Sequence, residues 1–151
     1  MSINVDRKNR HYASEDGALF NKGKTELFCV PGGKTGTYMI PNSVTSIGDW
    51  AFIGCADLTS VIIPRNVKKI GSGAFGTCLG LTTITIPSGV NNIDDGAFTH
   101  CENLVSVYFE GNAPSMGKDV FRKTADEFTI YYRAGTSGWS NPWNGYPTQE
   151  W

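Results

Sequence analysis

The sequence predicts an α/β, mostly β, solenoid of right-handed coils, with short parallel strands on a concave face and turns or short helical or 3-10 segments on the convex face. Three observations predict this fold class. Apolar residues recur every 23 positions through the middle of the chain. Each repeat holds one short segment of alternating side chains, which is typical of a single strand. The 151 residues also include 18 Gly and 7 Pro, so the chain makes many turns.

The 23-residue period defines the repeating unit. The dipeptide Ile-Pro begins at Ile40, Ile63 and Ile86, and other columns keep the same step. These columns are Val44, Val67 and Val90; Ile47, Ile70 and Ile93; Ala51-Phe52, Ala74-Phe75 and Ala97-Phe98; Cys55, Cys78 and Cys101; Leu58, Leu81 and Leu104; and Val61, Ile84 and Val107. One coil of this length cannot bury its apolar face, whereas coils stacked about 4.8 Å apart share one core. The period therefore predicts a stack of coils with aligned columns.

Each unit is expected to contain one strand. In the first complete unit, Val61 and Ile63 share one face while Ser60 and Ile62 share the other, as a short strand requires. Pro64 follows directly and ends the pairing, because proline has no backbone donor. The pattern therefore indicates one strand per coil.

The segment after each strand is expected to turn a corner and cross the convex side. Gly48 and Gly71 follow the isoleucine column and suit a left-handed corner, and Asp94, a residue type that tolerates this conformation, replaces them in the next unit. Residues 49–55 would then return as one helical or 3-10 turn that carries the Ala-Phe dipeptide into the core.

These units resemble the BspA-type leucine-rich repeats of bacterial surface proteins, whose unit runs Cys-x-x-Leu-x-x-Val-x-Ile-Pro-x-x-Val-x-x-Ile-Gly-x-x-Ala-Phe. Residues 55–75 follow this pattern column by column, and the resemblance covers about residues 35–132. The last unit is weaker, since Glu110 replaces the proline and Thr124 the cysteine. The resemblance implies a cell-surface or extracellular module that mediates protein interaction or adhesion through its concave strand face.

We divide the chain into three parts of one domain. Residues 1–34 form a partial N-terminal repeat and a β-hairpin with its turn at residues 21–24. Residues 35–132 form the 23-residue leucine-rich repeats, and residues 133–151 form an aromatic C-terminal cap.

The two ends of the stack are expected to differ. Ile3 and Val5 resemble the strand of a preceding coil, so we expect the chain to be a piece of a longer protein. Three of the four tryptophans lie in the C-terminal segment. We expect Trp139 and Trp143 to cover the last coil, because an uncovered coil exposes a large apolar patch. An aromatic platform for sugars is the alternative.

Strand parity predicts which side chains face outward on the concave side. One column carries a hydroxyl on every strand and consists of Thr37, Ser60, Thr83, Ser106 and Thr129. The other is apolar at one end and aromatic at the other, and consists of Met39, Ile62, Thr85, Tyr108 and Tyr131. Strand propensity and hydroxyl hydrogen bonds account for the first column, whereas a row of exposed apolar side chains is typical of a contact surface. All ten are candidate partner-binding residues.

The sequence offers little for catalysis or metal binding. Cys55, Cys78 and Cys101 share one column, so we expect buried free thiols one strand spacing apart rather than disulfides, and a free Cys29 as well. No Cys-x-x-Cys spacing predicts zinc, no Gly-rich loop predicts phosphate binding, and the two histidines lie in different units. We therefore predict no enzymatic activity, no metal and no cofactor.

Charge and hydropathy exclude two classes of partner. Thirteen Lys and Arg against 14 Asp and Glu give a net charge of −1, which disfavours nucleic acid and anionic membranes. No window reaches the roughly 20 apolar residues of a membrane-spanning helix, so we expect no membrane insertion by this chain. No signal peptide is recognised in it, because its first residues carry charges in place of an apolar stretch. A protein is the expected partner; the alternatives are a carbohydrate-binding module that uses exposed aromatics and a structural spacer within a larger surface protein.

Overall fold

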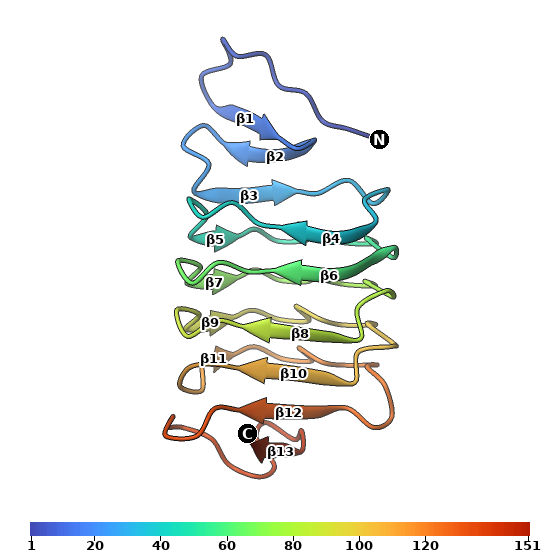
Figure 1. The fold of residues 1–151 in the computed structure, drawn as a ribbon, viewed down its shortest axis with the longest axis vertical. Helices are drawn as coiled ribbons and strands as arrows, with labels where there is room; N and C mark the ends of the chain where they lie inside the picture. The colour runs from blue at the N-terminus through green and yellow to red at the C-terminus, as the bar shows by residue number, and fades with distance from the viewer.

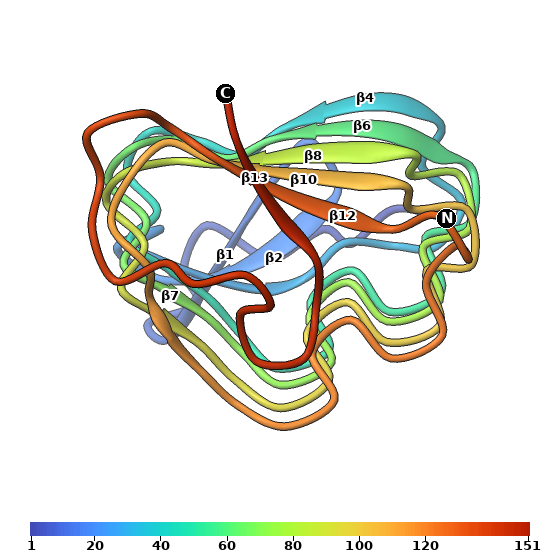
Figure 2. The ribbon, with the colours of Figure 1, turned by 90° about the horizontal axis from the view of Figure 1, so that it is seen from below.

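Each 23-residue unit folds into one coil, and the coils stack along a single axis (Figures 1 and 2). The structure is a computed structural model and describes all residues from 1 to 151. Each of the first four repeat coils carries one long and one two-residue strand, where the sequence predicts a single strand, and the fifth carries a long strand alone. The long strands are β4 (Gly36–Met39), β6 (Leu58–Ile62), β8 (Thr83–Ile86), β10 (Ser106–Phe109) and β12 (Thr129–Tyr132). The short strands are β5 (Ser46–Ile47), β7 (Lys69–Ile70), β9 (Asn92–Ile93) and β11 (Ser115–Met116).

The two kinds of strand build opposite walls of the stack. The short strands pair in parallel in an unbroken series, β3-β5-β7-β9-β11, where β3 is Glu26–Cys29. The long strands form two separate groups, β4-β6 and β8-β10-β12-β13, with β13 at Thr148–Glu150. No backbone pairing joins β6 to β8, and we call this interruption the seam. One wall of the solenoid is therefore continuous and the other is divided.

The N-terminal segment is an antiparallel meander that covers the first coil. Strands β1 (Tyr12–Glu15), β2 (Ala18–Asn21) and β3 pair in order, which confirms the turn expected at residues 21–24. An additional turn between β1 and β2 falls at Asp16 and Gly17, both of which have positive φ angles. Residues 1–11 contain no strand, so the strand expected around Ile3 and Val5 does not form; the Ile3 N–H instead donates to the Gly17 carbonyl at 2.9 Å.

One apolar core runs the length of the stack. Its centre is a column of phenylalanine rings in which Phe52, Phe75, Phe98 and Phe121 lie 4.8, 4.9 and 5.3 Å apart from one ring to the next. All four rings are buried. The column confirms that equivalent residues of successive coils lie directly over one another.

The convex side consists of turns, and the chain contains no helix. The helical or 3-10 option for residues 49–55 is therefore wrong. Only alternate residues there close local turns, as Ile53 N–H does by donating to the Trp50 carbonyl at 3.0 Å. The residues between them bond to the next coil, so no continuous helical series forms: Phe52 N–H donates to the Ala74 carbonyl at 2.7 Å, and Phe75 N–H donates to that of Ala97 at 2.7 Å. The structure therefore also contains no helix long and apolar enough to cross a bilayer.

Glycine occurs after the isoleucine column for a different physical reason from the one expected. Gly48 and Gly71 are absent from the positive-φ residues, as is Asp94. A Cβ on Gly71 would instead lie 2.5 Å from the Asp49 Oδ1 and 2.7 Å from the Asp49 nitrogen of the previous coil. Close approach of neighbouring coils therefore selects glycine here, and the left-handed residue is two positions later, at Trp50 and its equivalents.

The C-terminal segment lies across the last coil. Trp143 is buried, and Trp139 packs against the same core cluster. The Trp139 ring stacks on Tyr132 at 5.3 Å and lies 5.0 Å from Phe109. Strand β13 then pairs in parallel with β12. These contacts are those that a cap requires, and the stabilising role of the cap is a prediction taken up below.

Candidate functional site

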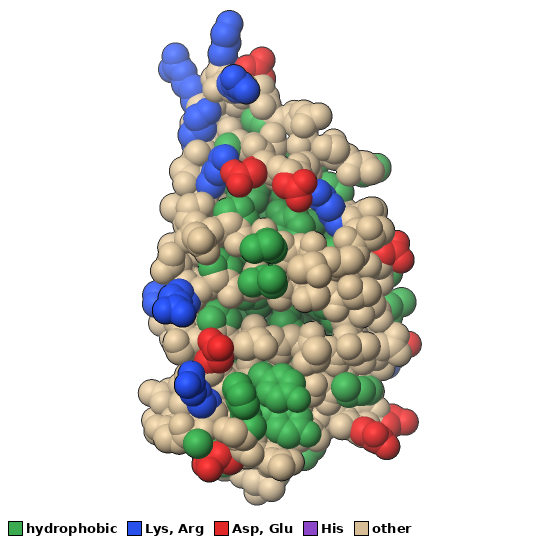
Figure 3. Space-filling view, in the orientation of Figure 1, with side chains coloured by type: hydrophobic (Ala, Val, Ile, Leu, Met, Phe, Trp, Pro, Cys, Tyr) green, Lys and Arg blue, Asp and Glu red, His purple; other side chains and the backbone are tan.

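The candidate residues lie along the outer surface of the long strands, here called the strand face. In one column Met39 and Ile62 are 69% and 48% exposed, Thr85 is exposed, and Tyr108 and Tyr131 are half-buried. These residues lie opposite one another wherever their strands pair, as Met39 does Ile62 and Thr85 does Tyr108. Hydrophobic side chains run down the middle of this face, and most charged side chains lie toward its rim and its N-terminal end (Figure 3).

The hydroxyl column is less uniform than its sequence. Thr37 and Thr83 are exposed, and Ser60 and Thr129 are half-buried. Ser106 is only 9% exposed, so it offers little surface to a partner, in contrast with its expected outward position. Its hydroxyl donates to the Thr83 Oγ1 at 3.1 Å. This hydrogen bond joins two neighbouring strands, so the Ser106 donor is already used within the protein. This column therefore has a structural role at Ser106.

Three aromatic rings gather at the C-terminal end of the strand face. The rings of Tyr108 and Tyr131 stack at 4.9 Å with 14° between their planes. Trp151 meets Tyr108 edge-on at 5.5 Å and is 53% exposed. Its backbone is fixed on both sides, because its N–H donates to the Tyr132 carbonyl and its carbonyl accepts from Ala134. We call Tyr108, Tyr131 and Trp151 the aromatic corner.

Sequence reasoning did not place Trp151 on this face. Thr148–Glu150 forms β13, a sixth strand of the same wall, in which Gln149 lies opposite Tyr131. Because β13 belongs to no 23-residue unit, the repeat gives it no register. The alternation of Thr148, Gln149 and Glu150 before an aromatic residue is the one local signal, and it is too short to distinguish from a loop.

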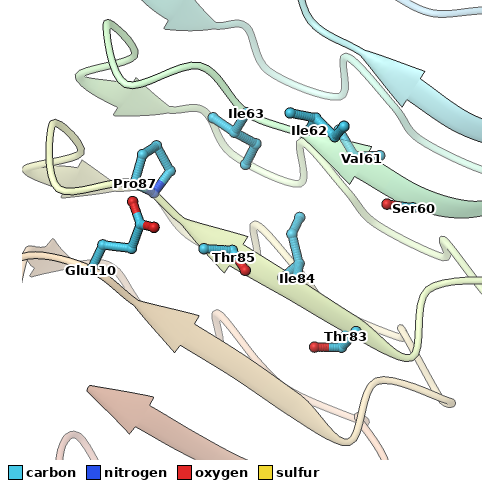
Figure 4. Close-up of a pocket in the computed structure, with 9 residues that line it drawn as sticks. All are labelled: Ser60, Val61, Ile62, Ile63, Thr83, Ile84, Thr85, Pro87 and Glu110. Atoms are coloured by element: carbon cyan, nitrogen blue, oxygen red, sulfur yellow. The ribbon is translucent and has the colours of Figure 1, made fainter. Parts of the chain in front are cut away.

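A hollow of about 350 Å³ opens on the strand face at the seam (Figure 4). The buried Val61 and Ile84 line it, together with the hydroxyl-bearing Ser60, Thr83 and Thr85. Its remaining lining residues are Ile62, Ile63, Pro87 and Glu110. The hollow therefore combines apolar and hydroxyl-bearing side chains with the open edges of two strands.

The cysteine column lies in the core, away from the strand face. Cys55, Cys78 and Cys101 are buried free thiols. The Cys78 and Cys101 thiols donate to the carbonyls of Phe52 and Phe75 at 3.1 and 2.9 Å. Burial away from water raises the pKa of the Cys101 thiol to about 11 and that of Cys55 to about 11. Such thiols are poor nucleophiles, because the thiolate is the reactive form.

The acidic, histidine and cysteine side chains form no metal-binding cluster. The structure brings together no group of three or more His, Cys, Asp or Glu side chains that could hold a metal ion. Lys69 and Asp94 form an ion pair at 2.8 Å on the wall of short strands, which lowers the pKa of Asp94 through its hydrogen bond with Lys69. This pair links the two coils across which the long strands are unpaired.

The chain belongs to the family of BspA-type leucine-rich repeats. The model of that family, described as "BspA type Leucine rich repeat region (6 copies)", matches residues 32–136. The matched range includes residues 35–132, over which the resemblance extends. No curated protein sequence matches the chain.

Solved structures of bacterial proteins share the fold. A leucine-rich repeat protein from Eubacterium ventriosum is 26% identical, with a TM-score of 0.77 over 87% of this chain and 36% of the other. The pneumococcal vaccine antigen PcpA is 18% identical, with a TM-score of 0.62 over 89% of this chain and 45% of the other. A leucine-rich cell surface protein from Faecalibacterium prausnitzii is 21% identical, with a TM-score of 0.61 over 90% of this chain and 42% of the other. The chain thus spans less than half the length of these three proteins.

Proposed function

We propose that this chain is a non-enzymatic interaction module of a bacterial surface protein that binds a protein partner through its strand face. The observation that carries the proposal is the exposed row from Met39 and Ile62 to the aromatic corner. Soluble proteins rarely keep such side chains together on one surface unless the surface makes contacts. Tyrosine and tryptophan are also enriched at protein interfaces, where their rings contribute large contact areas.

The location at a cell surface is supported by relatives rather than by any segment of this chain. One structural relative is described as a leucine-rich cell surface protein and another as a pneumococcal vaccine antigen. The absence of an assembled nucleophile and base is consistent with a binding role. An interaction module needs only the surface that the stacked strands present.

The test is capture of surface proteins by the immobilised chain. Extracts of bacterial and epithelial cell-surface proteins are passed over the wild-type chain and over a Tyr108→Ala, Tyr131→Ala double variant. We expect the double variant to keep its melting temperature within a few degrees and to lose the captured protein. The matched control is Ile53→Ala with Leu79→Ala, which removes two exposed apolar side chains from the turns outside the strands.

Four outcomes would count against the proposal. If the double variant unfolds, the tyrosine rings are structural. If it captures as well as the wild type, the aromatic corner makes no contact with the partner. If a glycan array retains the chain through these rings while no protein is captured, the surface is a carbohydrate-binding site, and if neither assay gives a ligand, the chain is a spacer.

A further inference from the structure

The seam is an opening in an otherwise regular wall. On the opposite wall β7 and β9 pair in register, with Lys69 opposite Asn92 and Ile70 opposite Ile93. On the strand face the same two coils present β6 and β8 with no pairing between them. The main-chain donors and acceptors of β6 and β8 that point into the seam therefore have no strand partner, which is the situation of an exposed sheet edge.

Two glycines mark the ends of the seam. At the start of the strands, Asn103 donates to the Leu79 carbonyl at 2.8 Å, but the equivalent residue one coil earlier is Gly80. Past the end of the strands, Asn66 donates to the Asn42 carbonyl at 2.8 Å, but the equivalent residue one coil later is Gly89. The first bridge joins the coils of β8 and β10 and the second joins those of β4 and β6, whereas the coils of β6 and β8 have neither.

The coils touch at both of these glycines. A Cβ on Gly80 would lie 2.5 Å from the Leu58 carbonyl oxygen, and one on Gly89 would lie 2.1 Å from that of Arg65. The main chains are therefore in contact before and after the strands, while the strands between them stand apart. The seam is a closed-ended opening about as long as β8, whose four residues span roughly 13 Å at about 3.3 Å per residue.

We propose that this opening is a strand-addition site that takes an extended segment of a partner protein between β6 and β8. An extended backbone offers alternating N–H and C=O groups on both of its edges, so it can pair with both walls at once. Every second side chain of the segment would face inward onto Val61 and Ile84, which favours small apolar residues there. The hollow, at about 350 Å³, lies at the lower end of ordinary ligand-site volumes.

Occupation requires the seam to widen. A complete added strand needs β6 and β8 about 9.6 Å apart, which is two strand spacings. The continuous pairing of β7 with β9 on the opposite wall provides the pivot for this motion. The segment enters and leaves through the strand face, because the coils are in contact at Gly80 and Gly89.

This inference rests on the proposed function, since Ser60, Ile62, Thr83 and Thr85 also belong to the strand face. It names a different part of that face from the aromatic corner, and the two can fail separately. The pairing of β8 with β10 is intact, so the aromatic corner lies beyond the seam. Loss of Tyr108 and Tyr131 should leave binding at the seam unchanged.

The experiment selects heptapeptides from a random phage-displayed library on the intact chain and compares their affinities for a seam-locked variant. The locked variant carries Ser60→Cys and Thr83→Cys, with Cys29→Ser to prevent mispairing. A disulfide needs Cβ atoms about 3.5–4.5 Å apart, which is less than one strand spacing of about 4.8 Å, so its formation between these two unpaired strands draws β6 and β8 together and holds the seam closed. We expect the selected peptides to bind the oxidised variant about tenfold or more weakly, and to bind the same variant normally after reduction. Reduction is the matched control, because the polypeptide is identical.

A second arm does not depend on any protein variant. The selected peptides are resynthesised with N-methyl groups on alternate amides, which removes main-chain donors and keeps the side chains. Strand addition predicts that at least one of the two methylation patterns abolishes binding. Equal binding of both patterns, equal binding to the oxidised variant, or no selected peptide at all would overturn the inference. Peptides that lose binding only with Tyr108→Ala and Tyr131→Ala would place recognition at the aromatic corner and support the proposed function alone.

Discussion

At the scale of single residues, the repeat columns reflect contacts between coils. Each cysteine of the column donates its thiol to a carbonyl of the preceding coil, as Cys101 does to Phe75. A small, weakly polar side chain fits there because the site is buried and offers one acceptor. The sequence predicted this role from the shared column, and the structure confirms buried free thiols.

The buried thiols predict a loss of stability at alkaline pH. Burial raises the pKa of Cys55 and Cys101 from 9.0 to about 11, so the folded protein holds these protons more tightly than the unfolded chain. Their contribution is complete below pH 9 and is lost as the pH rises toward 11, at up to about 1.4 kcal/mol per pH unit for each thiol. Urea unfolding between pH 8 and pH 11 measures this slope.

The control for this prediction is Cys101→Ala, which should unfold with a shallower dependence on pH. An unchanged slope would assign the alkaline loss to other groups, such as Tyr38, whose pKa burial raises to about 12. Alkylation of the unreduced chain in denaturant should label all four thiols. Any smaller number would mean that a disulfide forms.

A side chain at position 71 is predicted to clash with the preceding coil, an effect that does not depend on helix or turn preferences. A Cβ at this position would lie 2.7 Å from the backbone nitrogen of Asp49, and backbone atoms cannot move aside. We expect Gly71→Ala to destabilise the fold by roughly 1–3 kcal/mol, as overpacking does in cores. Gly23→Ala is the control, since its nearest atom is a side-chain methyl at 3.9 Å and its φ is negative. Equal unfolding midpoints for the two variants would contradict the close approach.

At the scale of elements, the sequence predicted the strand that alternation marks within each unit and missed the strands that alternation does not mark. The long strands follow from alternation within each unit, and they occur at the expected columns. The short strands, such as Ser46–Ile47, contain two residues and acquire their pairing only from the next coil. β13 lies outside the period altogether. The local pattern is too short to identify either kind of strand.

The repeat pattern also could not predict the seam. Val61 and Ile84 occupy the same column, so the strands on either side of the seam look equivalent in sequence. The sequence differs at the seam in two positions: Gly80 stands where the next unit has Asn103, and Gly89 stands where the preceding unit has Asn66. Only the structure shows that those asparagines bond to carbonyls of the preceding coil, so the effect of the two glycines could not be predicted from the sequence.

The C-terminal segment predicts a stability effect at this scale. The Trp139 ring contacts Phe109, Tyr132 and Trp143, and its Nε1–H donates to the Thr136 Oγ1 at 3.0 Å. We expect Trp139→Ala to lower the melting temperature by several degrees, since each kcal/mol lowers it by roughly 2–4 °C in a chain of this size. Trp151→Ala, which removes an exposed ring from the same segment, should change it less.

Thermal unfolding followed by circular dichroism measures both tryptophan variants. Equal small shifts would mean that residues 133–151 do not cover the last coil in any stabilising way. Unchanged stability of Trp139→Ala together with lost glycan binding would favour the sugar-platform alternative.

At the scale of the whole molecule, stacking determines both fold and surface. The phenylalanine column at 4.8–5.3 Å spacing keeps equivalent residues aligned, so outward positions on separate strands become one face. The candidate columns could therefore be placed from strand parity alone. Their exposure could not, because Ser106 is buried beside Thr83, and Trp151 comes from a segment without a repeat.

Residue-by-residue amide exchange of the free protein, measured by NMR, tests most directly the claim that one wall of the stack is continuous and the other divided. We predict slow exchange for paired amides throughout β7, β9, β10 and β12. Alternate amides of β6 and β8, those that point into the seam, should exchange much faster than their equivalents in β10. Uniformly slow exchange across β6 and β8 would mean that the long strands form one unbroken sheet, and would contradict the account.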